Sequence, residues 1–100
     1  MAKELNETTF DSEVQGLTIV DFWAPWCGPC RAQAPILETL EAEMPEVKVA
    51  KVNVDENEEL AMRFGVRSIP TLIVFENGAP KAKAVGTQSL ADLKKLIAQK

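Results

Sequence analysis

One apolar run, Leu17-Thr18-Ile19-Val20-Asp21-Phe22-Trp23, places the strongest constraint on the fold of this chain. A strand with apolar side chains on both faces must be covered on both faces, as in the centre of an α/β sheet. Residues 47–54 form a second strand-like run. The chain has 100 residues, of which 46% are hydrophobic. We therefore expect a single domain over residues 1–100.

Strand and helix patterns alternate along the rest of the chain. Further strands are expected at 3–5, 71–75 and 81–85, and helices at 9–14, 29–44, 57–64 and from 89 onward. Thr9 can cap the first helix, and Asn77-Gly78 predicts a hairpin whose last strand is an edge carrying Lys81 and Lys83. Two helical crossovers imply parallel strands and the hairpin an antiparallel edge. The fold class is α/β, with a mixed sheet of about five strands flanked by four helices.

Composition excludes several functions. The net charge of −4, without a basic stripe, argues against nucleic acid as a ligand. The chain has no His and only two Cys, which are too few ligands for a closed zinc site in a monomer, so we expect no metal. No apolar run approaches the roughly 20 residues that span a membrane, and the first residues lack a secretory signal. We therefore expect a cytoplasmic protein.

The two cysteines occur in Trp26-Cys27-Gly28-Pro29-Cys30, after a predicted strand and at the start of a predicted helix. This context is typical of a redox dithiol. The positive end of the helix dipole stabilises the Cys27 thiolate, which makes Cys27 the nucleophile and Cys30, one turn on, the resolving thiol. The alternatives are two inert cysteines or a structural disulfide, which would stabilise so short a loop by only about 2 kcal/mol.

Asp21 is an anomaly, because a carboxylate between Val20 and Phe22 in a central strand is costly to bury in its charged form. Desolvation should raise its pKa, and a water-bridged contact would let it take the proton from Cys30. The alternative is a structural carboxylate, at an edge or paired with Lys51 on the adjacent strand.

Aromatic and proline residues give weaker signals. Trp23 and Trp26 can simply pack in the core, although for Trp26 we favour a contact with substrate. The bond between Ile69 and Pro70 is a candidate for a cis peptide, which the residues alone do not decide.

The stretch from Val20 to Cys30, VDFWAPWCGPC, closely resembles the active-site stretch of the thioredoxin family. The resemblance extends over nearly the whole chain, through Ala34-Pro35-Ile36-Leu37, Lys51-Val52-Asn53-Val54-Asp55, Gly65-Val66-Arg67-Ser68-Ile69-Pro70-Thr71-Leu72, Asn77-Gly78 and Val85-Gly86. The segment Arg31-Ala32-Gln33 departs from the family's commoner Lys-rich, bulkier sequence, so partner preference does not carry over.

The resemblance implies the thioredoxin fold and a general protein-disulfide reductase and electron carrier that acts in redox homeostasis. Cys27 would attack, Cys30 would resolve, and Asp21 near Lys51 would assist proton transfer. It also implies that Pro70 is cis and packs against the dithiol. Substrate polypeptide would then lie in a groove formed by Trp26, Gly28, Pro29, Ile69, Pro70 and Gly86.

The implied partners are proteins with disulfides and, as electron donor, a thioredoxin reductase or a ferredoxin-linked enzyme. The chain itself has no Gly-rich dinucleotide fingerprint, so we expect no bound cofactor. We expect a monomer that acts away from membranes. Two alternatives on the same fold are an oxidase or isomerase and a binding subunit without redox turnover.

Overall fold

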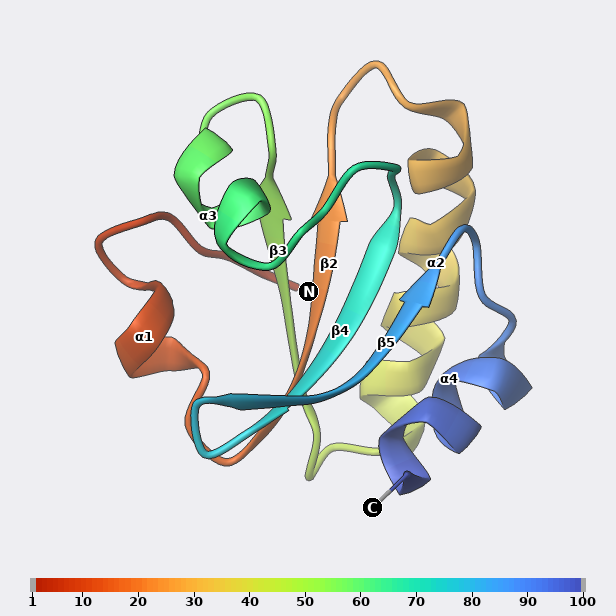
Figure 1. Ribbon diagram of the computed structural model, residues 1–100. Helices are drawn as coiled ribbons and strands as arrows, with labels where there is room; N and C mark the ends of the chain where they lie inside the picture. The colour runs from red at the N-terminus through yellow and green to blue at the C-terminus, as the bar shows by residue number, and fades with distance from the viewer. Residues whose placement is uncertain (1, 100) are drawn as a thin grey trace.

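The computed structural model of the protein describes residues 2–99, which form five strands and four helices. In chain order these are β1 (Lys3–Glu4), α1 (Phe10–Glu13), β2 (Leu17–Trp23), α2 (Gly28–Glu43), β3 (Lys48–Asn53), α3 (Glu58–Arg63), β4 (Thr71–Glu76), β5 (Ala79–Val85) and α4 (Leu90–Ala98). Figure 1 shows the sheet between two layers of helices, with α1 and α3 on one side and α2 and α4 on the other. Within the described residues, no helix has the length and apolar character needed to cross a membrane.

The five strands form one mixed sheet in the order β1-β3-β2-β4-β5. The crossovers through α1 and α2 join parallel strands, and the hairpin between β4 and β5 is antiparallel, as predicted. The third helical connection, through α3, behaves differently, because β4 runs antiparallel to β2. The predicted α/β class, with five strands and four helices, is confirmed.

Strand β2 lies at the centre of the sheet, and its alternating side chains supply two separate cores. On the side of α1 and α3, Val20 and Phe22 pack in a cluster that includes Phe10, Phe75 and Leu60. On the other side, Ile19 packs in a cluster with buried residues of α2 and α4, among them Leu37, Leu40, Leu93, Leu96 and Ile97. Asp21 and Trp23 share the face of Ile19, since side chains two apart on a strand point the same way. The carboxylate of Asp21 is therefore directed toward α2.

Two local predictions need correction. Thr9 is the N-cap residue of α1, but its side chain makes no capping hydrogen bond. Asn6 instead closes the turn that leads into α1, because its Oδ1 accepts from the backbone N–H groups of Thr8 at 2.8 Å and Thr9 at 3.0 Å. Strand β5 also begins at Ala79, two residues earlier than predicted, and a β-bulge at Val74/Phe75 marks its pairing with β4.

Candidate active site

The site forms where the chain leaves β2 and enters α2. Cys27 and Cys30 are joined by a disulfide, with their Cα atoms 5.2 Å apart, so the structure represents the oxidised state. Cys27 is the N-cap residue of α2, and its Sγ accepts a hydrogen bond from the Cys30 backbone N–H at 3.2 Å. An N-terminal N–H group that points at a sulfur stabilises negative charge on it. The sequence therefore places Cys27 where a thiolate is best stabilised.

Burial does not distinguish the two cysteines, because Cys27 is 4% exposed and Cys30 is 3% exposed. Their surroundings do distinguish them. Cys27 Sγ lies 3.8 Å from the carbonyl oxygen of Ile69, to which a thiol S–H can donate once the disulfide is reduced. Cys30 instead lines a cavity on the other side of the disulfide, together with Asp21. The two sulfurs thus face two different environments.

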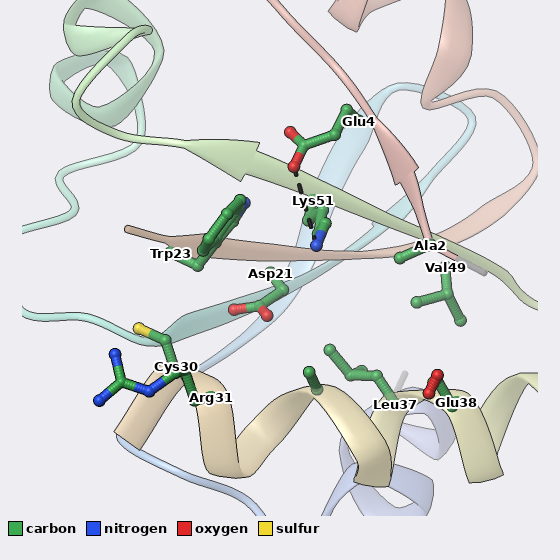
Figure 2. Close-up of a pocket in the computed structure, with 11 residues that line it drawn as sticks. Ala2, Glu4, Asp21, Trp23, Cys30, Arg31, Leu37, Glu38, Val49 and Lys51 are labelled. Carbon is green, nitrogen blue, oxygen red and sulfur yellow. Dashed lines mark ion pairs between the residues drawn. The ribbon is translucent and has the colours of Figure 1, made fainter. Parts of the chain in front are cut away.

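The cavity has a volume of about 480 Å³ and lies between α2 and the strands β1, β3 and β2 (Figure 2). Its walls are mostly apolar, with charged groups from both the strands and α2; the lining residues are Ala2, Glu4, Asp21, Trp23, Cys30, Arg31, Ala34, Leu37, Glu38, Val49 and Lys51. A space of this size with polar groups in its wall can hold water. Cys30 and Asp21 both line this space.

Asp21 is 3% exposed, and its Oδ1 has no hydrogen-bond partner among residues 2–99. Burial raises the pKa of Asp21 to about 7; the Lys51 cation partly offsets this increase and the Glu4 carboxylate adds to it. The expectation that this carboxyl is buried is confirmed. A carboxyl group with this pKa exchanges protons readily near neutral pH.

Lys51 does not pair directly with Asp21 in the described part of the chain. It lies between Glu4 and Asp21 in the register of three adjacent strands. Its Nζ is 3.8 Å from the Glu4 carboxylate and 4.4 Å from the centre of the Trp23 ring. The alternative in which Lys51 satisfies Asp21 through an ion pair is therefore wrong, and Lys51 acts on Asp21 only through its charge.

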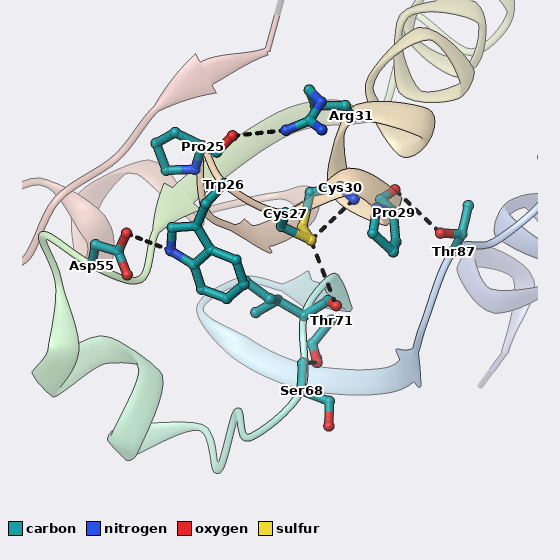
Figure 3. Close-up of a disulfide and its surroundings, with 11 residues drawn as sticks. Pro25, Trp26, Cys27, Pro29, Cys30, Arg31, Asp55, Ser68, Thr71 and Thr87 are labelled. Atoms are coloured by element: carbon teal, nitrogen blue, oxygen red, sulfur yellow. Dashed lines mark hydrogen bonds between the residues drawn. A yellow bond between two sulfur atoms is a disulfide. The ribbon is translucent and has the colours of Figure 1, made fainter.

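On the other side of the disulfide, the residues expected to form the groove come together. The Trp26 side chain is exposed, with 67% of the residue accessible, and its indole N–H donates to Asp55 Oδ2 at 2.9 Å (Figure 3). Ile69 packs against the disulfide, and its bond to Pro70 is cis. The Gly86 N–H donates to the Pro70 carbonyl at 2.8 Å. Gly28 and Pro29 are exposed at the start of α2.

Three residues that support this arrangement were not predicted from the sequence. Asp55 fixes the Trp26 ring, Glu4 pairs with Lys51, and Arg31 Nη1 donates to the Pro25 carbonyl at 3.0 Å across the active-site loop. The available signal for Asp55 was its position directly after a core strand. The contact of Glu4 depends on strand register and that of Arg31 on loop geometry, and the sequence specifies neither.

A disulfide at the N-terminus of a helix, with a buried carboxyl on one side and an exposed tryptophan on the other, defines a thiol–disulfide oxidoreductase. The chain matches the family model "Thioredoxin" over residues 1–99. It is 48% identical to a thioredoxin of Chlamydia pneumoniae over 98 residues, covering 97% of this chain and 96% of the relative. It is 47% identical to a thioredoxin of Alicyclobacillus acidocaldarius, covering 94% and 92% of the two chains, and 44% identical to a thioredoxin of Bacillus subtilis, covering 91% and 89%.

The chain therefore belongs to the thioredoxin family and has the thioredoxin fold. Its activity is that of a protein-disulfide reductase with a redox-active Cys27–Cys30 pair. The substrates of this family are disulfides. The expectation that the Ile69–Pro70 bond is cis is confirmed.

Proposed function

We propose that the two cysteines have fixed and different roles, with Cys27 as the attacking thiolate and Cys30 as the resolving thiol. The observation that carries this proposal is that the two cysteines have different surroundings. Cys27 adjoins the Ile69 carbonyl, and Cys30 lines the Asp21 cavity. On the side of Cys27, the exposed Trp26 side chain offers apolar area to a polypeptide.

In the first step the Cys27 thiolate attacks one sulfur of the substrate disulfide. A mixed disulfide forms between Cys27 and the substrate, and the other substrate sulfur leaves as a thiolate. The Cys30 N–H, at 3.2 Å from Cys27 Sγ, stabilises the attacking anion.

In the second step Cys30 loses its proton and attacks Cys27 Sγ. The Cys27–Cys30 disulfide forms and the second substrate sulfur leaves, so the substrate gains two electrons and the protein loses two. Asp21 accepts the Cys30 proton through the cavity, because its pKa of about 7 suits a base at neutral pH. The nearby charge of Lys51 favours the ionised form of Asp21 and so keeps this pKa from rising further.

The substrate segment binds in an extended form over Trp26, Gly28, Pro29, Ile69, Pro70 and Gly86. Trp26 supplies exposed apolar area. Backbone hydrogen bonds to an extended segment do not depend on the sequence of the substrate. Broad specificity for protein disulfides follows from such a surface.

The oxidised protein must then be reduced again, and we assign this step to a thioredoxin reductase, as the family suggests. A monomer suits an edge strand β5 that carries Lys81 and Lys83. Action as an electron carrier in redox homeostasis, a cytoplasmic location and the lack of nucleic-acid partners remain predictions.

Trapping of the mixed disulfide tests the assignment of roles. The reduced Cys30→Ser variant, incubated with a protein disulfide such as insulin, should accumulate a mixed disulfide at Cys27, because no resolving thiol remains. The Cys27→Ser variant is the matched control and should trap little or none. If the Cys27→Ser variant accumulated a mixed disulfide at Cys30 and the Cys30→Ser variant accumulated none at Cys27, the roles would be reversed.

A further inference from the structure

Gln33 is a fully buried polar side chain on α2, with 0% of the residue exposed. It follows Cys30 by three residues, which is about one helical turn. Its amide makes two hydrogen bonds to the backbone of Gln88: Gln33 Nε2 donates to the Gln88 carbonyl at 3.0 Å, and Gln33 Oε1 accepts from the Gln88 N–H at 2.6 Å. A buried amide that uses both of its ends in this way fixes its partner firmly, because either group would be costly to leave unpaired.

Gln88 belongs to the groove loop, which we define as residues 86–88 between β5 and α4. The Gln88 side chain donates to the Gly86 carbonyl at 3.0 Å, and the Gly86 N–H donates to the Pro70 carbonyl at 2.8 Å. A continuous chain of hydrogen bonds therefore runs from Gln33 to Pro70. It ends at two residues of the proposed substrate groove.

A second contact fixes the same loop to the start of α2. The Thr87 hydroxyl donates to the Pro29 carbonyl at 3.2 Å (Figure 3). Above Gly86 the surface is open, since a Cβ built there would have no heavy atom within 4 Å, although the residue has a φ of +92°. The loop is thus hydrogen-bonded to α2, and the space next to Gly86, where a substrate would lie, is open.

We propose that Gln33 is a positioning residue for substrate binding, because it holds the groove loop, and through Gly86 the Pro70 carbonyl, in place. This inference rests on the proposed groove. Gln33 touches neither the substrate nor the reacting sulfurs, so its removal should weaken the binding of proteins and leave the chemistry of the dithiol intact.

Gln33→Leu removes both hydrogen bonds at nearly constant volume. We expect its KM for a protein disulfide to rise about fivefold or more, while kcat changes less than twofold. The reaction of the reduced protein with a small disulfide, 5,5′-dithiobis(2-nitrobenzoate), should keep its wild-type rate. A KM equal to the wild-type value, or an equal loss with the small and the protein disulfide, would overturn the proposal.

Gln33→Glu tests the two hydrogen bonds through the pH dependence of KM, which a purely structural role of Gln33 would leave unchanged. A protonated carboxyl can both donate to the Gln88 carbonyl and accept from its N–H, whereas an ionised carboxylate can only accept. The KM of this variant should be near the wild-type value at low pH and rise with pH relative to wild type. A constant ratio of the two KM values across pH would contradict the proposal.

Leu40→Ala is the matched control, because Leu40 is also fully buried on α2 but belongs to the core cluster away from the groove. It should lose stability and keep its KM; an equal rise in KM would show a general effect of destabilisation and overturn the proposal. If Gln33→Leu does not fold, Gln88→Ala, which removes the side-chain bonds to the Val85 and Gly86 carbonyls, should raise KM in the same direction, and an unchanged KM would count against the proposal.

The variant Trp26→Ala separates this inference from the groove on which it rests. A raised KM in Trp26→Ala together with a wild-type KM in Gln33→Leu would overturn the role of Gln33 alone. Wild-type KM values in both variants would overturn the groove as well.

Discussion

At the scale of single residues, Asp21 couples the chemistry of the site to the stability of the fold. Its pKa rises from 3.8 to about 7 because the carboxyl is buried, so the folded protein binds this proton more tightly than the unfolded chain does. Between pH 4 and 7 the unfolded chain has released the proton and the folded protein retains it. The contribution of Asp21 to stability therefore falls as pH rises through this range.

Asp21→Asn should remove this pH dependence. The free energy of unfolding of the variant should equal or exceed that of wild type near pH 4, and the advantage should grow by about 4 kcal/mol up to pH 7–8. Urea unfolding at a series of pH values measures the difference. Parallel curves for the two proteins would show that Asp21 is not a buried acid with a raised pKa. Turnover of the variant should be slower at neutral pH, because the proton acceptor for Cys30 is lost.

Trp26 is the residue with the clearest expected effect on substrate binding alone. Because it is 67% exposed, Trp26→Ala should change the free energy of unfolding by less than about 1 kcal/mol. The KM for a protein disulfide should rise about fivefold or more, as is common for an aromatic contact residue. Asp55→Ala frees the Trp26 ring and should raise KM less. Steady-state kinetics with insulin checks both variants, and an unchanged KM in both would exclude Trp26 from the groove.

At the scale of helices and strands, α4 continues directly from the groove loop and begins with a defined cap. The Ser89 side chain accepts from the Asp92 N–H at 3.1 Å. Ser89→Ala should therefore lower the free energy of unfolding by about 1 kcal/mol. Ser68→Ala, at an exposed serine outside the helices, is the control and should cost less than half as much. Equal losses in urea unfolding would show that the cap contributes nothing specific.

Most helices and strands could be predicted within one or two residues, because their apolar periods and turn residues are local signals. The side-chain bonds at the start of α1 could not, since Asn6 and Thr9 are both good capping residues and only the path of the backbone gives Asn6 the bonds to the turn before the helix. The direction of β4 was also not predicted. Its partner β2 is about fifty residues earlier in the chain, and no local pattern specifies that pairing.

The candidate site was predictable where its residues are chemically unusual in their local sequence. Cys27, Cys30 and Asp21 stand out in this way. Glu4 and Gln33 do not, because the significance of each depends on a residue far along the chain: Lys51 for Glu4 and Gln88 for Gln33. Spacing within one element does not reveal such contacts.

At the scale of the whole molecule, the redox state should alter stability as well as reactivity. The Cys27–Cys30 disulfide closes a loop of about four residues. It lowers the conformational entropy of the unfolded chain, which stabilises the folded protein by about 2 kcal/mol. We expect the oxidised protein to be more stable than the reduced protein by about this amount in urea, with and without dithiothreitol. The variant with both cysteines replaced by Ser should not respond to dithiothreitol. A reduced form as stable as the oxidised form would contradict this expectation.

The reduction potential of the Cys27–Cys30 couple tests the central claim, that this protein donates electrons to disulfides. It is measured by equilibrating the protein with a glutathione or reference dithiol buffer and counting the free thiols. We expect about −270 mV, which is the established value for thioredoxin itself. A potential between about −180 and −120 mV, as in isomerases and oxidases of this fold, would contradict the assignment as a reductase.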